Sequence, residues 1–127
     1  MHMERVRKEY FKKADIHIEH RTEDALVAIQ GPKSAELLQP YLKTDLTQIY
    51  FNQFVKETIP QFSAEFIFYR TGYTGEDGFE ISMPNSVVND FVDSLFKSKD
   101  LYPAGLGARD ALRLEAGEII RALLTRS

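Results

Sequence analysis

The chain has 127 residues and a formal net charge of −3, from 16 lysines and arginines against 19 aspartates and glutamates. That balance argues against general nucleic-acid binding, and the absence of cysteine excludes disulfides, cysteine-based metal sites and thiol nucleophiles. Hydrophobic residues make up 43% of the chain, with nine phenylalanines, which is enough for the core of one ordinary domain.

The N-terminal segment, residues 1–14, is charged from its start. We interpret its basic stretch, residues 5–13, as a helix with a solvated face; a linker remnant and part of a targeting segment are the alternatives. Ile16 and Ile18 then alternate with polar residues, a pattern that predicts a short half-buried strand. No apolar run in the sequence has the length of a membrane span, so we expect no membrane partner.

The next part of the chain predicts a strand, a turn and a helix. Residues 26–30 (LVAIQ) are typical of a strand. Gly31 and Pro32 end it, and proline suits the first turn of the helix that we expect over 34–39. Residues 45–59 carry several aromatic side chains but favour no single element.

Two further strands are predicted on either side of a glycine-rich loop. Residues 64–70 contain the aromatic run FIFY, which favours a strand covered on both faces. After the loop, Phe79, Ile81 and Met83 alternate with polar residues and predict another strand.

The C-terminal third predicts two helices. Apolar residues at helical spacing over 86–98 indicate the clearest helix of the chain, with Asn85 as its N-cap. A last helix is expected to begin at Gly107 or Ala108, and Gly117 is expected to interrupt it. Sequential strand pairs with helices between them predict an α+β fold of antiparallel strand pairs packed with helices.

The loop between the two central strands has the sequence RTGYTGEDGFEI at 70–81. About eight residues connect the strands, which is long for a hairpin, and the glycines allow positive φ or the close approach of another molecule. We expect Glu76 and Asp77 to lie at a solvated tip. Glu80 follows on the strand and points away from the Phe79 face.

Glu80 has two interpretations. If its face of the sheet is open to water, it is an ordinary outward residue. If that face lines a cleft, Glu80 is a carboxylate on a rigid strand that can accept two parallel N–H donors. Aminopyrimidine rings, including pterins, present such a donor pair.

A second glycine-containing segment reads GLGARDALRLEAG at 105–117. It fails the dinucleotide fingerprint, because Asp110 stands where a third glycine is required. Arg109 falls in the first helical turn, where the helix dipole disfavours a cation, so a specific partner, a pair with Asp110 or with another nearby acid, and no pair at all are open alternatives. Arg113 and Glu115 are expected to form surface or interdomain pairs. His17 and His20, with only Glu19 nearby, make a metal site improbable.

Together the two segments resemble hallmark segments of the glycine cleavage T-protein family, the aminomethyltransferases. ALVAIQGPKSAELLQ at 25–39 resembles a third segment of that family in the same order. The resemblance covers roughly residues 15–117, which are expected to form the folate-binding type of domain, and residues 118–127 read as a divergent tail.

The resemblance implies an activity and a site. The family transfers a methylene group from the aminomethyl-lipoyl arm of H-protein to tetrahydrofolate, its co-substrate, and releases ammonia. By resemblance, Glu80 contacts the pterin N–H donors, Arg109 orients folate as a fixed cation, and Tyr73 packs near the ligand. The compartment implied is the mitochondrial matrix in a eukaryote and the cytoplasm in a bacterium.

The resemblance also implies limits. The family's catalytic aspartate lies upstream of the matched region and maps to no residue here, and a C-terminal domain lies outside it. We therefore expect the isolated chain to be inactive, to bind tetrahydrofolate weakly or undetectably, and to self-associate through surface that other domains cover. The alternative is a stand-alone, non-catalytic module that binds folate or another protein.

Overall fold

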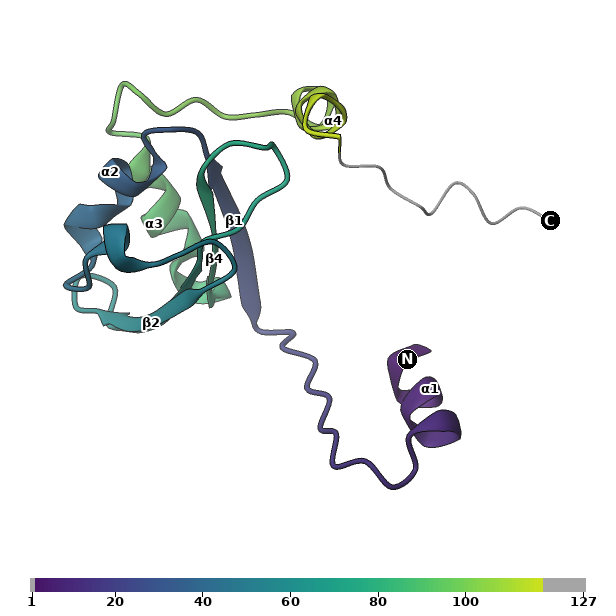
Figure 1. The fold of residues 1–127 in the computed structure, drawn as a ribbon. Helices are drawn as coiled ribbons and strands as arrows, with labels where there is room; N and C mark the ends of the chain where they lie inside the picture. The colour runs from purple at the N-terminus through teal and green to yellow at the C-terminus, as the bar shows by residue number, and fades with distance from the viewer. Residues whose placement is uncertain (1, 118–127) are drawn as a thin grey trace.

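The computed structural model describes residues 2–117 and centres on one antiparallel sheet (Figure 1). The sheet has four strands in the order β1-β4-β3-β2, and every neighbouring pair is antiparallel. This confirms the predicted α+β class. The strands are β1 (Asp24–Gln30), β2 (Phe54–Ile59), β3 (Ala64–Tyr69) and β4 (Gly78–Pro84).

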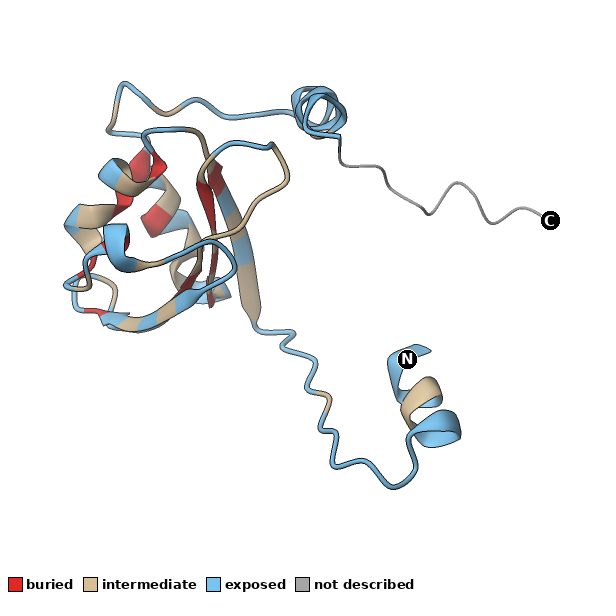
Figure 2. Cartoon of the chain, in the orientation of Figure 1, coloured by how far each residue is buried: buried red, intermediate tan, exposed pale blue. Residues whose placement is uncertain are grey.

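The core lies between one face of the sheet and the helices α2 (Ser34–Leu38) and α3 (Val88–Leu95) (Figure 1). Phe79 and Ile81 on β4 point into it, as their alternation with polar residues predicts. Phe91 of α3 meets Phe66 of β3 edge-on, with ring centroids 5.1 Å apart. Figure 2 shows that the buried residues concentrate in this layer.

The central strand β3 confirms the prediction of cover on both faces. Its consecutive residues Phe66, Ile67 and Phe68 are all buried, although only the two phenylalanines point toward the helices. Ile67 points to the opposite face of the sheet and is only 7% exposed, so both faces of β3 are covered, which explains why its apolar residues do not alternate with polar ones.

The predicted strand at Ile16 and Ile18 is wrong. Residues 15–21 adopt neither strand nor helix and connect the domain to α1 (His2–Tyr10), which lies away from the sheet (Figure 1). A short alternating segment forms a strand only where a neighbour supplies hydrogen bonds, and β1 begins after this segment at Asp24. The helix predicted over 5–13 is present as α1, but it begins at His2 and ends at Tyr10, and all its residues are exposed or half-buried (Figure 2).

Asn85 does not cap α3. The chain first makes a 3₁₀ turn, η3 (Asn85–Val87), and α3 begins at Val88 without a side-chain cap. The backbone N–H of Asn85 donates to the carbonyl of Glu23 at 2.9 Å. Asn85 therefore ties the end of β4 to the start of β1.

The regions between the strands add short 3₁₀ turns, and the last helix stands apart. Residues 45–59 form η2 (Leu46–Gln48) and then β2, while η1 (Gln39–Tyr41) extends α2. Helix α4 (Leu106–Glu115) lies away from the core (Figure 1) and ends near Gly117, whose φ is +77°. The divergent tail, residues 118–127, lies outside the described residues.

Candidate ligand-binding site

The face of the sheet opposite the helices carries Glu80. On β4, Glu80 lies opposite Ala28 of β1 and Tyr69 of β3, so it occupies an inner strand with a neighbour on each side. Its side chain is half-buried. The strand fixes the backbone of Glu80 from both sides, and a rigid backbone is what a recognition carboxylate requires.

A cavity of about 470 Å³ runs along β1 and brings the predicted site residues together. It is lined by Glu80 from β4, Tyr73 from the glycine loop and Arg109 from α4, with residues of both β1 faces and of the segment after α3. The three residues come from two segments of the sequence, 70–81 and 105–117, and the structure places all three on one cavity.

Arg109 has an aromatic partner. Its guanidinium carbon lies 5.6 Å from the centre of the Tyr73 ring, within the range of a cation–π contact. Asp110 pairs instead with Arg113, at 2.6 Å between Nε and Oδ1. The pair between Arg109 and Asp110 is therefore not formed, while the surface pairing expected of Arg113 is present.

The prediction that Asp77 lies at a solvated tip is wrong, because its carboxylate is bound by Arg70. Arg70 donates from Nε to Oδ1 of Asp77 at 2.9 Å and from Nη2 to Oδ2 at 2.8 Å, a bidentate ion pair. These hydrogen bonds lower the pKa of the Asp77 carboxyl, against the opposing effect of burial. Glu76 is exposed as expected.

Arg70 is a structural residue that sequence analysis missed. Beyond Asp77, its Nη1 donates to the carbonyls of Leu46 at 3.0 Å and Ile49 at 2.7 Å. Its guanidinium also lies 5.5 Å from the centre of the Phe79 ring. The signal was available: Arg70 directly follows one strand and Asp77 directly precedes the next, so the hairpin places them face to face.

Gln30, the last residue of β1, enters the glycine loop with its side chain. Its Nε2 donates to the carbonyl of Thr71 at 3.1 Å, and its Oε1 accepts from the hydroxyl of Thr74 at 3.1 Å. A Cβ atom at Gly72 or at Gly78 would collide with this carboxamide. The close approach that these glycines permit is therefore made by a side chain of the protein itself.

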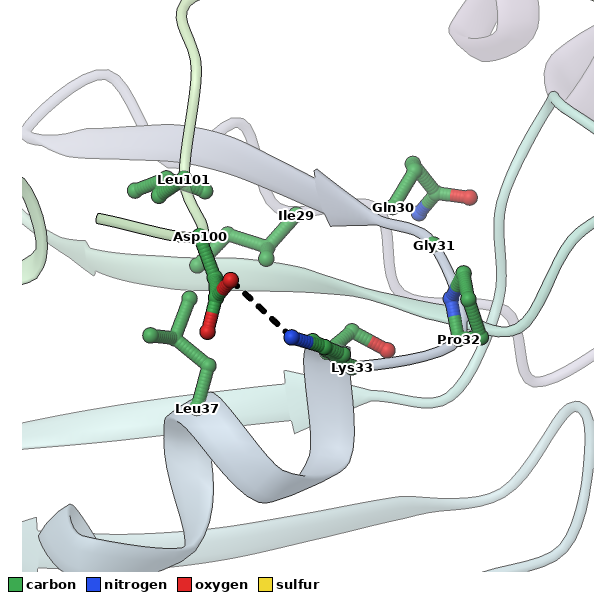
Figure 3. A pocket seen from close by; sticks show the side chains of 9 residues that line it. Ile29, Gln30, Gly31, Pro32, Lys33, Leu37, Asp100 and Leu101 are labelled. Carbon is green, nitrogen blue, oxygen red and sulfur yellow. Dashed lines mark ion pairs between the residues drawn. The ribbon is translucent and has the colours of Figure 1, made fainter. Parts of the chain in front are cut away.

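A second cavity, of about 310 Å³, lies at the turn from β1 to α2 (Figure 3). An ion pair between Lys33 and Asp100 crosses it, with 2.9 Å between Nζ and Oδ1. Both side chains are more than half exposed, at 63% and 60%. Water screens such an exposed pair. We therefore interpret the ion pair as a surface contact that connects the start of α2 with the segment after α3.

Residues 2–117 hold no cluster of three or more histidine, cysteine, aspartate or glutamate side chains arranged to bind a metal ion. Among the same residues, no helix has both the length and the apolar character that crossing a bilayer requires.

Fold and cavity together define an antiparallel α+β domain with a carboxylate and a guanidinium on one ligand-sized cavity. The model of the GCVT N-terminal domain family matches residues 1–122, so the chain belongs to this family.

Named relatives agree with the family. The chain is 47% identical over 107 residues to an aminomethyltransferase of Thermoanaerobacter sp. (strain X514), which covers 81% of this chain and 29% of the relative. It is 44% identical over 108 residues to the mitochondrial aminomethyltransferase of Mesembryanthemum crystallinum, which covers 84% of this chain and 26% of the relative.

A solved structure is similar as well. The glycine cleavage system aminomethyltransferase T from Bartonella henselae matches with a TM-score of 0.64 and 36% identity, over 77% of this chain and 26% of that chain. The chain thus spans between about a quarter and three tenths of the length of the proteins it matches.

Proposed function

We propose that this chain is the folate-binding part of a glycine-cleavage aminomethyltransferase. That enzyme transfers a methylene group from the aminomethyl-lipoyl arm of H-protein to tetrahydrofolate and releases ammonia. The observation that carries the proposal is the shared cavity of Glu80, Tyr73 and Arg109 in a member of this family. Its volume, about 470 Å³, lies in the range of small-molecule sites.

Each of the three residues has a distinct role in the proposal. Glu80 accepts the parallel N–H donors of the pterin ring, and its place on the inner strand β4 holds the carboxylate in one orientation. Arg109 provides a permanent cation that orients folate, and the Tyr73 ring in turn holds the guanidinium. This part of the enzyme contributes chiefly by positioning the acceptor of the methylene group.

The proposed activity requires parts of the enzyme that lie outside these 127 residues. No catalytic residue is assigned within the chain, and H-protein and tetrahydrofolate are partners of the whole enzyme. We expect the 127-residue chain alone to be inactive in methylene transfer. Both bacterial and plant mitochondrial relatives exist, so we propose the cytoplasm for a bacterial source and the mitochondrial matrix for a eukaryotic one.

A chimera tests the proposal. Residues 15–117 would replace the aligned segment of the Thermoanaerobacter relative, and methylenetetrahydrofolate formation would be measured with aminomethylated H-protein. We expect activity in the chimera. Glu80→Gln and Arg109→Gln should each lower kcat/KM for tetrahydrofolate by about tenfold to a hundredfold, since each removes a charge-assisted hydrogen bond.

Glu76→Gln is the matched control, because Glu76 is an exposed acid of the same loop region. We expect kcat/KM to remain unchanged in this variant. An equal loss in all three variants would refute the assignment of Glu80 and Arg109. A chimera that binds tetrahydrofolate but transfers no methylene group would favour the stand-alone binding module instead.

A further inference from the structure

The carboxamide of Gln30 contacts the glycine loop at both ends. It donates to Thr71 near the start of the loop, accepts from Thr74, and lies against the Cα atoms of Gly72 and Gly78. The neighbouring Gly31 N–H adds a backbone hydrogen bond to the carbonyl of Asp77, at 2.7 Å. In Figure 3 the Gln30 side chain points away from the ion pair in the second cavity.

The backbone does not by itself require glycine at two of these positions. Positive φ angles among the described glycines occur at Gly31, Gly75 and Gly117, and not at Gly72 or Gly78. What excludes a Cβ at Gly72 and Gly78 is the Gln30 carboxamide, whose atoms such a Cβ would overlap. Gln30 and the two glycines therefore form one packing unit.

Tyr73 lies between the two hydrogen bonds that Gln30 makes. Because residues 71 and 74 are both held, the backbone of Tyr73 has little freedom, and its ring is directed to Arg109. Gln30, Tyr73 and Arg109 all line the same cavity. We propose that Gln30 is a positioning residue, which fixes Tyr73 and through it the guanidinium of Arg109.

The proposal is tested first without a ligand. The full 127-residue chain, labelled with ¹⁵N, would be compared with Gln30→Ala by NMR and by amide hydrogen exchange. We expect shifted amide signals for Tyr73, Thr74 and Arg109, and faster exchange in the loop by about threefold to tenfold, the effect of losing a neutral hydrogen bond. Gln61→Ala is the matched control, since Gln61 is exposed in the turn between β2 and β3.

A double variant tests the packing of Gln30 against Gly72. Gly72→Ala should perturb the loop strongly in the wild-type background, because the new Cβ collides with the carboxamide. In the Gln30→Ala background the same change should perturb the loop much less, because the obstacle is gone. Equal effects of Gly72→Ala in both backgrounds would overturn the proposal. Amide signals of Tyr73 and Arg109 that do not shift in Gln30→Ala would overturn it as well.

The consequence for ligand binding rests on the function proposed above, whereas the placement of Tyr73 does not. In a millimolar tetrahydrofolate titration followed by NMR, Gln30→Ala should raise Kd threefold to tenfold and Gln61→Ala should leave it unchanged. Gln30→Met, which keeps the volume but not the hydrogen bonds, should bind as weakly as Gln30→Ala. An unchanged Kd in Gln30→Ala would contradict the positioning role, while equal losses for Glu80→Gln, Arg109→Gln and Glu76→Gln in the chimera would count against the proposed function only.

Discussion

At the scale of single residues, three carboxylates within five positions have three different environments. Glu76 is exposed, Asp77 is fixed by Arg70, and Glu80 lines the cavity. Their chemistry is nearly the same, so the environment alone assigns the role. The conspicuous acidic pair of the loop thus divides into a solvated residue and a structural one, and neither lines the cavity that Glu80 lines.

Replacing Asp77 by asparagine should destabilise the fold. The change removes the negative charge of the carboxylate that accepts both hydrogen bonds from Arg70, so the guanidinium loses its counter-charge. Because the Asp77 side chain is 34% exposed and partly screened, we expect a loss of about 1–2 kcal/mol in the free energy of unfolding at pH 7. Urea unfolding monitored by circular dichroism measures this quantity.

The effect should depend on pH with a definite sign. The hydrogen bonds from Arg70 make the pKa of Asp77 lower in the folded state than its unfolded value of about 3.9. The stabilisation is therefore complete above the unfolded pKa and disappears as the pH falls through the folded pKa. The difference between wild type and Asp77→Asn should shrink accordingly, while Glu76→Gln has little effect at any pH. A difference that grows in acid would contradict the ion-pair role.

At the scale of elements, periodicity in the sequence predicted most of the fold. Strand alternation in β4 and the apolar stripe of α3 depend on burial of one face; β4 formed where the pattern placed it, and α3 (Val88–Leu95) formed inside the predicted range 86–98. Ile16 and Ile18 show the limit, because alternation does not tell whether a partner strand exists. Gln30 shows another limit, since its contacts lie 41 and 44 residues away and follow from strand register.

Helix α4 provides a prediction at this scale, because it meets the glycine loop at a second point. Gly75 has a φ of +74°, and a Cβ there would lie 3.0 Å from that of Ala116, just after α4. Gly75→Ala should therefore strain the loop by about 1–2 kcal/mol and push on the helix end. We expect faster hydrogen exchange in α4 and a weaker contact between Tyr73 and Arg109.

A glycine-to-alanine change within helix α4 itself is the control. A Cβ at Gly107 would meet open space, and alanine favours helix, so Gly107→Ala should leave α4 equally or more protected. If both glycine variants behaved alike, α4 would be independent of the loop. That result would also weaken the case for Arg109 as a fixed part of the cavity.

At the scale of the whole molecule, the cavity has only partial walls. One side consists of β1 and β4, but the α4 side is formed by a helix whose residues are exposed or half-buried (Figure 2). A ligand there would keep much of its surface in water, so we expect the chain alone to bind tetrahydrofolate more weakly than micromolar. Isothermal calorimetry checks this, and a micromolar Kd would show that the chain closes the site unaided.

The distribution of apolar surface gives the last prediction. Tyr50, Phe51 and Phe54 gather at the start of β2, an edge strand, and are 69%, 68% and 59% exposed. An exposed aromatic group beside an unpaired strand edge favours association with another copy of the chain. We therefore expect concentration-dependent self-association of the isolated chain in sedimentation velocity experiments.

Substitutions distinguish this aromatic surface from the N-terminal segment, residues 2–21, as the site of self-association. Phe51→Ser with Phe54→Ser should weaken self-association by at least about tenfold, because burying a phenylalanine contributes about 1.5–3 kcal/mol. Phe11→Ser, at a residue that is 52% exposed just after α1, should leave it unchanged. Self-association that depends on Phe11 instead would assign the contact to the N-terminal segment. A monomer by light scattering at every concentration would show that the exposed β2 edge does not drive association.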